Sequence, residues 1–98
     1  MKKYKIIRSI QLLSSLENLV INKTQFSPEY AEKFKEKVID GISSLNVFPY
    51  IGKPIGYDRR AKVIDGHLLI YSIDEKSLTV KVLTIVDPRQ YLIAKKYY

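Results

Sequence analysis

The spacing of hydrophobic residues in the first part of the chain changes at residue 10. Tyr4 to Ser9 reads as a short strand, which needs a sheet to join. From Ile10 onward, hydrophobic residues recur every three or four positions, which is typical of one face of a helix. This stripe consists of Leu12, Leu13, Leu16, Leu19 and Val20. We expect a helix that begins at Ile10 and ends near Asn22 and Lys23.

A second helix is predicted to begin at Ser27-Pro28. Serine is a favoured N-cap residue, proline fits the first helical position, and Glu29 suits the positive end of the helix dipole. A second stripe at helical spacing follows: Tyr30, Phe34, Val38, Ile42 and Leu45. Two consecutive amphipathic helices with a short link predict a helical hairpin, with both stripes packed into a core.

The second half of the chain favours three strands, at about residues 59–64, 67–73 and 78–86. Asp65-Gly66 separates the first two, and such a dipeptide favours a type I′ hairpin turn with positive φ at both residues. The turn predicts three cross-strand pairs: Ile64 with His67, Lys62 with Leu69, and Arg60 with Tyr71. Together these elements predict an α+β fold, with an antiparallel sheet of about four strands and both helices on one sheet face.

Alternation along the predicted hairpin divides its side chains between two faces. Ala61, Val63, Leu68 and Ile70, with Ser72 at the edge, are expected to form the core face. The opposite face is basic and aromatic, and we expect function there; it carries Arg60, Lys62, His67, Leu69 and Tyr71. Lys81 is expected on this basic face, because an unpaired lysine in a core is costly. That placement requires an odd-length loop after residue 73, or a bulge.

The segment from Asn46 to Asp58 contains two prolines and two glycines and is predicted to be a loop. It is expected to pack tightly against the domain, because Phe48, Tyr50 and Ile51 favour burial.

Composition narrows the class of protein. The chain has 98 residues, enough for a single domain over residues 1–98, and its 17 Lys and Arg against 10 Asp and Glu give a formal charge of +7. This charge favours a polyanionic partner, either nucleic acid or an acidic protein segment, and a merely soluble surface is the alternative. With no cysteine, no signal-peptide pattern and no long apolar run, a cytoplasmic protein without a membrane partner is expected.

Few catalytic chemistries suit these residues. There is one histidine and no phosphate-binding glycine motif, so we expect neither a metal site nor a cofactor. His67 suits a general base by its usual pKa, although a histidine after a turn is more often an exposed strand residue. The remaining candidates are cations, namely Arg60, Lys62, Lys81 and Arg89, which can hold phosphate oxygens. Arg59 lies beside them in the chain and is expected to point the other way unless a bulge turns it. Tyr71, Tyr91, Tyr97 and Tyr98 can stack on bases.

The order of elements resembles the RelE/ParE toxin superfamily of bacterial toxin–antitoxin modules over nearly the whole chain. Five features carry the resemblance: Tyr4-Lys5-Ile6 in the first strand; Leu45, Pro49 and Gly52 after the second helix; Arg59-Arg60 at the next strand; the run from His67 to Asp74; and the closing Asp87-Pro88-Arg89-Gln90-Tyr91. Ser15 departs from the pattern, because many members have an acidic residue there.

The resemblance implies a toxin neutralised by a cognate antitoxin, with operator DNA bound through the antitoxin. RelE-like members cleave messenger RNA on the ribosome without metal, and ParE-like members poison DNA gyrase. The basic face favours RNA cleavage, with the gyrase target as the alternative and a non-enzymatic nucleic-acid-binding module as the competing class. The RelE-like roles fall on Arg60, Lys62, Arg89, Tyr91 and Tyr98 as catalytic residues, and on Arg59, Tyr71, Lys81 and His67 as substrate-binding residues. In such a reaction the ribose 2′-hydroxyl attacks the phosphate, with Lys62 as base and the two arginines Arg60 and Arg89 as a clamp.

Overall fold

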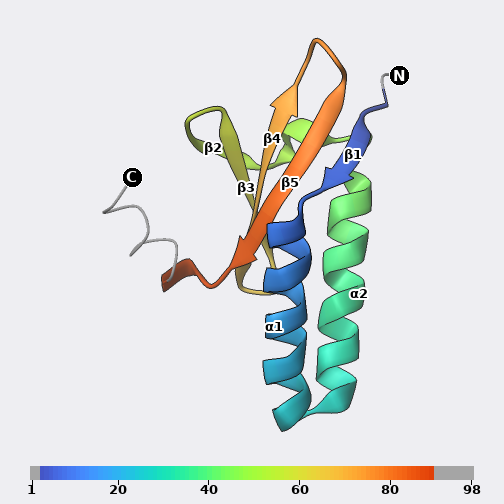
Figure 1. The fold of residues 1–98 in the computed structure, drawn as a ribbon, viewed down its shortest axis with the longest axis vertical. Coiled ribbons are helices and arrows are strands. Elements are labelled where there is room, and N and C mark those ends of the chain that lie inside the picture. Colours follow the sequence, from blue (N-terminus) through green and yellow to red (C-terminus); the bar gives the residue numbers. More distant parts are fainter. Residues whose placement is uncertain (1–2, 90–98) are drawn as a thin grey trace.

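A computed structural model describes residues 3–89, which form one α+β unit (Figure 1). In chain order, its elements are β1 (Lys5–Arg8), α1 (Ile10–Phe26), α2 (Pro28–Ser44), a 3₁₀ turn (Pro49–Ile51), β2 (Lys53–Gly56), β3 (Arg59–Ile64), β4 (His67–Asp74) and β5 (Thr79–Val86). No helix within residues 3–89 is long and apolar enough to cross a membrane.

The strands form one sheet in the order β1-β5-β4-β3-β2. β1 runs parallel to β5, and the other neighbours are antiparallel. The predicted α+β class and the pairing of the first strand within the sheet are confirmed, but the sheet is mixed and not antiparallel throughout, because β1 is parallel to β5. The sheet has five strands instead of about four because β2, inside the segment predicted to be a loop, pairs with β3.

The Asp65-Gly66 turn has the predicted geometry, with φ of 50° at Asp65 and 79° at Gly66. Positive φ at both residues matches the twist of the two strands, so the pairing register follows from the turn. All three predicted pairs are present: Ile64 with His67, Lys62 with Leu69, and Arg60 with Tyr71.

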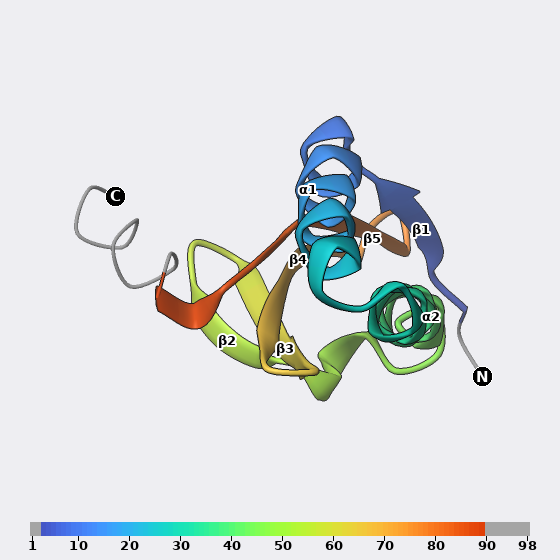
Figure 2. The same cartoon turned by 90° about the horizontal axis from the view of Figure 1, so that it is seen from below.

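The two helices lie side by side as a hairpin that extends beyond the sheet (Figures 1 and 2). Ser27 caps α2 as predicted, and its side-chain oxygen accepts from the backbone nitrogen of Tyr30 at 3.2 Å. α1 continues to Phe26, past the predicted end near Lys23. The same Ser27 donates its backbone N–H to the carbonyl of Lys23 at 2.9 Å, so one residue closes α1 and opens α2.

The core lies on the sheet face that the sequence analysis assigned to function. Leu12 of α1 and Phe34, Val38 and Ile42 of α2 pack there against Leu69, Tyr71, Val80, Val82 and Ile85. We call this the core face, and it also carries Arg60, Lys62, Ile64 and His67. The opposite face, which we call the second face, carries Arg59, Ala61, Val63, Leu68, Ile70, Ser72 and Lys81. The prediction was therefore wrong about the covered face: Ala61 and Ile70 are buried, but Val63 is 68 % exposed.

Lys81 also lies on a different face from the one predicted. It pairs with Ser72, which in turn pairs with Arg59, so all three share the second face. Asp74 pairs with Thr79, which leaves a symmetric loop of four residues between them. β5 does contain a bulge, but it falls at Leu83, beyond Lys81, and does not change the direction of the lysine. Because the helices do not cover the second face at this point, Lys81 is exposed without any cost of burial.

Candidate functional site

Tyr71 is a buried structural residue of β4. Its side chain has no exposed surface, so it is unavailable to stack on a base. Its hydroxyl donates to the carbonyl of Pro49 at 2.6 Å and accepts from the backbone nitrogen of Gly52 at 2.9 Å. Burial raises the pKa of this hydroxyl, which stays neutral and keeps both bonds. Tyr71 therefore holds the segment before β2 and does not contact a substrate, which corrects the sequence-based expectation.

Gly52 is needed because of this close contact. A Cβ at residue 52 would lie 2.6 Å from the Tyr71 hydroxyl and 2.9 Å from the carbonyl oxygen of Ala61. The backbone of Gly52 is extended, so space and not conformation excludes a side chain.

Arg60 binds the same segment from β3. One guanidinium nitrogen donates to the carbonyl of Gly52 at 2.6 Å and to that of Tyr50 at 3.3 Å. The guanidinium group also lies 4.7 Å from the centre of the Tyr50 ring, a cation–π contact. These contacts engage one terminal nitrogen of the Arg60 guanidinium with the protein itself.

Glu75, in the β4–β5 loop, links Tyr50 of the 3₁₀ turn to Tyr4 through hydrogen bonds. One carboxylate oxygen accepts from the Tyr4 hydroxyl at 2.7 Å and also from the Tyr50 hydroxyl. The hydrogen bond to Glu75 raises the pKa of Tyr4 to about 12 and is the main cause of the raised pKa of Tyr50. The 3₁₀ turn is thus fastened to β3, β4 and the β4–β5 loop, although it is itself at the surface.

We call residues 48–51 the display loop, because it presents large hydrophobic side chains outward. Phe48 is 60 % exposed and Ile51 is 58 % exposed, and Tyr50 is half exposed. Pro49 faces inward and is buried. The prediction that Phe48, Tyr50 and Ile51 are buried is therefore wrong. Their hydrophobicity suggested burial, whereas the bonds that turn them outward come from residues distant in the sequence.

Lys62 supports the end of α2. Its amino group donates to the Ser44 hydroxyl at 3.1 Å, and that hydroxyl donates to the Gly41 carbonyl at 2.9 Å. A cation near a helix C-terminus complements the helix dipole. Lys62 is half-buried and lies on the core face with Arg60, as predicted, but the nearest residues are those of the helix.

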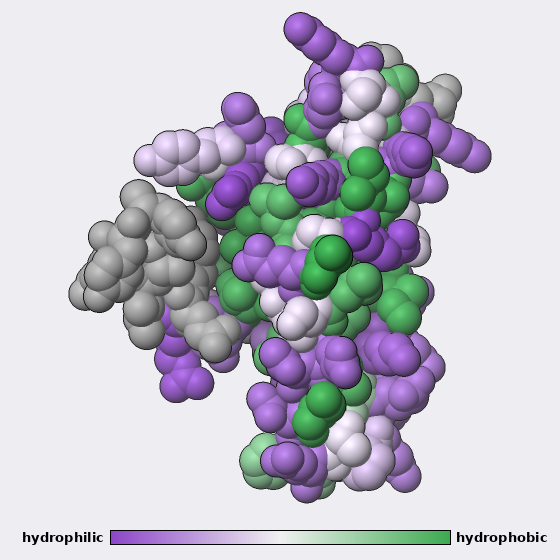
Figure 3. Space-filling model, viewed as in Figure 1, coloured by the Kyte–Doolittle hydropathy of each residue, from purple (hydrophilic) through white to green (hydrophobic). Residues whose placement is uncertain are grey.

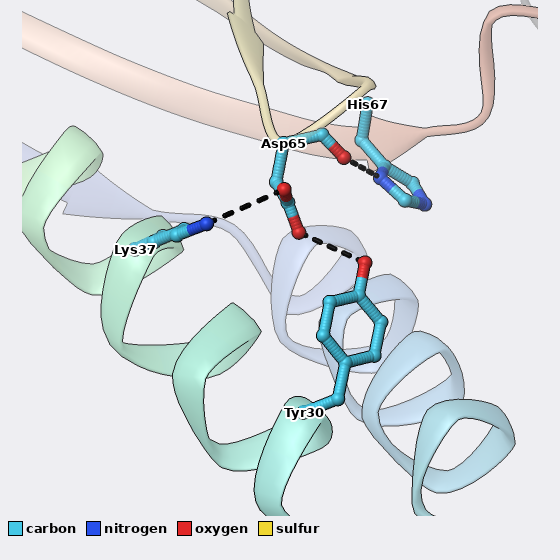
Figure 4. Close-up of polar contacts among 4 residues, drawn as sticks. All are labelled: Tyr30, Lys37, Asp65 and His67. Carbon is cyan, nitrogen blue, oxygen red and sulfur yellow. Dashed lines mark hydrogen bonds and ion pairs between the residues drawn. The ribbon is translucent and has the colours of Figure 1, made fainter. Parts of the chain in front are cut away.

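His67 and Asp65 fasten the hairpin turn to α2 (Figure 4). The Asp65 carboxylate accepts from the Tyr30 hydroxyl at 2.9 Å and pairs with Lys37 at 3.4 Å. The bond from Tyr30 and the nearby Lys37 hold the pKa of Asp65 below its ordinary value. His67 is buried, with Nδ1 3.0 Å from the backbone oxygen of Asp65 and its ring 4.9 Å from that of Phe34. It is therefore neither an exposed strand residue nor placed to contact a substrate.

The cations that were expected to converge are separated. Arg60 and Lys62 are on the core face, whereas Lys81 is on the second face; Arg59 is also on the second face, as predicted. Arg89 follows β5, is highly exposed and pairs with Asp87 at 3.3 Å. Tyr91 and Tyr98 lie outside the described residues. Within residues 3–89, no group of three His, Asp or Glu side chains is arranged to hold a metal ion.

An apolar hollow lies at the far end of the helical hairpin. It is lined by Leu19, Asn22, Lys23, Phe26 and Tyr30. The Lys23 amino group lies 5.2 Å from the centre of the Tyr30 ring, so this cation is already in contact with an aromatic face. The hollow offers no pair of groups suited to acid–base chemistry.

The sequence matches a known protein family over most of its length. A family model described as the ParE toxin of the type II toxin–antitoxin system parDE matches residues 9–90. No curated protein matches the chain in sequence.

Three solved structures share the fold at low sequence identity. A chain of the chromosomal ParDE system from P. aeruginosa has a TM-score of 0.76 at 12 % identity, covering 87 % of this chain and 96 % of that one. A mutant of the E. coli toxin RelE in the free state has a TM-score of 0.70 at 14 % identity, covering 95 % and 92 %. A chain of the RelBE2 toxin–antitoxin complex from Mycobacterium tuberculosis has a TM-score of 0.65 at 19 % identity, covering 87 % and 98 %.

Proposed function

Since this chain belongs to the ParE toxin family of type II toxin–antitoxin systems, we propose that it is a toxin that inhibits DNA gyrase by binding to it. A cognate antitoxin neutralises it in this proposal. The resemblance described above associates ParE-like members with gyrase and RelE-like members with messenger RNA cleavage, so the choice depends on the cationic residues.

The proposal rests on the hydrogen bonds that Arg60 makes to the backbone of residues 50 and 52. An RNA cleaver needs cations directed at the scissile phosphate in a water-accessible site. Arg60 instead binds the carbonyls of Gly52 and Tyr50, and Lys62 binds Ser44. Inhibition by binding needs no such cluster, because affinity is distributed over an interface with a few anchor residues.

RNA cleavage is the second candidate, and one observation favours it. Arg59, Ser72 and Lys81 are paired across three neighbouring strands on the second face, and both cations are exposed. Such a row suits the phosphates of a nucleic-acid backbone. In this reading Arg59 and Lys81 bind the RNA, and Arg89, Tyr91 and Tyr98 supply the chemistry.

The antitoxin is proposed to bind on the second face instead of the core face, which the helices fill. Val63 and Ile7 are exposed there, with Lys81 and Arg59 near them. Figure 3 shows hydrophobic side chains gathered over the strands and the start of α1, with hydrophilic ones above and below. An amphipathic, acidic segment complements such a surface. Val63→Asp is expected to weaken the complex, measured by co-purification with the product of the adjacent reading frame.

Inducing the chain in cells, with messenger RNA cleavage and DNA breaks followed in parallel, tests the target. Gyrase inhibition predicts DNA breaks and loss of supercoiling before any change in messenger RNA. Cleavage of messenger RNA at the ribosome, with supercoiling unchanged, would establish the second candidate instead.

A further inference from the structure

The display loop combines two properties that seldom occur together at a surface. Its side chains are large and apolar, yet its backbone is held by bonds from β3 and β4, and its Tyr50 hydroxyl is bound by the β4–β5 loop. Tyr71 fixes Pro49 and Gly52, Arg60 fixes Gly52 and Tyr50, and Glu75 fixes Tyr50. Isolated exposed hydrophobic residues are common, but a group of them on a rigid segment is typical of a binding surface.

Phe48 and Ile51 stand at the two ends of the 3₁₀ turn. The backbone nitrogen of Ile51 donates to the carbonyl of Phe48 at 3.3 Å, so this bond fixes the spacing of the two exposed residues. Pro49 lies between them in the chain and points into the protein. The loop therefore presents a pair of anchors whose backbone loses little freedom on binding, and such preorganisation improves affinity.

The charges around the loop indicate the chemistry of the partner. Lys53, two residues after the turn, is exposed, and the Arg60 guanidinium lies 4.7 Å from the centre of the Tyr50 ring, whereas the carboxylate at the loop, that of Glu75, accepts from the Tyr50 hydroxyl. The balance is positive, so the complementary surface is an apolar hollow with carboxylates at its rim. Nucleic acid suits the loop less well. Ile51 has no ring to stack on a base, and the Arg60 guanidinium already binds two carbonyls.

We propose that the display loop is the surface with which this toxin holds its protein target, and that Phe48 and Ile51 are its anchors. The inference rests on the proposed function, because it assumes inhibition by binding to a protein. Arg60, Tyr71 and Glu75 are positioning residues in this account, since Arg60 and Tyr71 hold the backbone of the loop and Glu75 holds the Tyr50 hydroxyl.

The test compares Phe48→Ala, Ile51→Ala and the double variant with Phe26→Ala. Phe26 is a matched control, because it is apolar and 89 % exposed at the opposite end of the helical hairpin. Each full-length toxin is prepared as the antitoxin complex, and the released toxin is titrated against purified DNA gyrase and, separately, against 70S ribosomes. Urea unfolding and reassembly with the antitoxin report whether the variants are folded.

The double variant is expected to bind gyrase about 30-fold more weakly, as is typical for loss of interface anchors. Phe26→Ala is expected to stay within about threefold, as non-anchor contacts do. Wild-type affinity of the double variant for gyrase would overturn the inference and leave the proposed function intact. A wild-type toxin that does not bind gyrase and cleaves messenger RNA on ribosomes would overturn both the inference and the proposed function.

Discussion

The hydroxyl oxygen of Tyr71 lies 2.9 Å from the backbone nitrogen of Gly52, and it lies 2.6 Å from the point where a Cβ on residue 52 would be. The bond and the close approach are two aspects of one contact. A buried phenol satisfies the backbone of a surface turn, and the glycine leaves room for it. Tyr71 of β4, which was predicted to bind substrate, therefore supports the display loop.

Gly52→Ala is expected to reduce the free energy of unfolding by about 1–3 kcal/mol, because the added methyl group overlaps the Tyr71 hydroxyl and the Ala61 carbonyl. Urea denaturation followed by circular dichroism measures this change. Lys53→Ala, next in sequence but exposed, is the control and should stay within about 0.5 kcal/mol. Equal stabilities for the two variants would show that the loop moves aside without cost.

Glu75→Gln is expected to return the pKa of Tyr4 from about 12 toward 10.0, because the hydrogen bond to the Glu75 carboxylate is the largest cause of the increase. A pKa that is higher in the folded state makes the neutral phenol stabilising. That contribution is complete below pH 10.0 and is lost as the pH rises through about 12. Absorbance of tyrosinate during alkaline titration, with Tyr4→Phe identifying the signal, measures the shift. An unchanged titration curve in Glu75→Gln would contradict the assignment.

Asp65→Asn is expected to make the protein less sensitive to acid. The pKa of Asp65 is lowered in the folded state, chiefly by the bond from Tyr30, so its contribution is present above its ordinary value of 3.8. The contribution is lost as the pH falls through the lower, folded value. Asparagine tolerates the positive φ of this turn, so the turn itself should persist. Urea midpoints between pH 7 and pH 2 should converge for wild type and variant at the acid end; parallel curves would refute the role of Asp65.

Arg60→Ala and Arg89→Ala distinguish the two modes of toxicity. Removing Arg60 releases the carbonyls of Gly52 and Tyr50, so binding through the display loop should weaken partly. Removing Arg89, which is highly exposed and pairs with the neighbouring Asp87, should leave toxicity nearly unchanged. In an RNA cleaver, loss of a phosphate-holding arginine costs on the order of 10²–10³ in rate. Growth at graded inducer concentrations measures both effects, and loss of toxicity in the Arg89→Ala variant would favour messenger RNA cleavage.

Several features of this protein follow from the sequence alone because their causes are local. Ser27-Pro28 determines where α2 begins, since the N-cap bond and the proline involve neighbouring residues. Asp65-Gly66 determines the β3–β4 register, since two positive φ values suffice to define the turn. The order of elements then indicates the toxin family, which the family model confirms.

The covered face of the sheet was decided only by the tertiary structure. Both faces of the β3–β4 hairpin carry apolar residues: Val63, Leu68 and Ile70 on one, and Ile64, Leu69 and Tyr71 on the other. Alternation alone therefore does not distinguish the core face, because either set satisfies it. The helices bury the set with Leu69 and Tyr71, and this choice directs Arg60 and Tyr71 toward the display loop and Lys81 toward solvent. The exposure of Phe48 and Ile51 depends on partners in β3, β4 and the β4–β5 loop, and contacts between such distant residues leave no local pattern in the sequence.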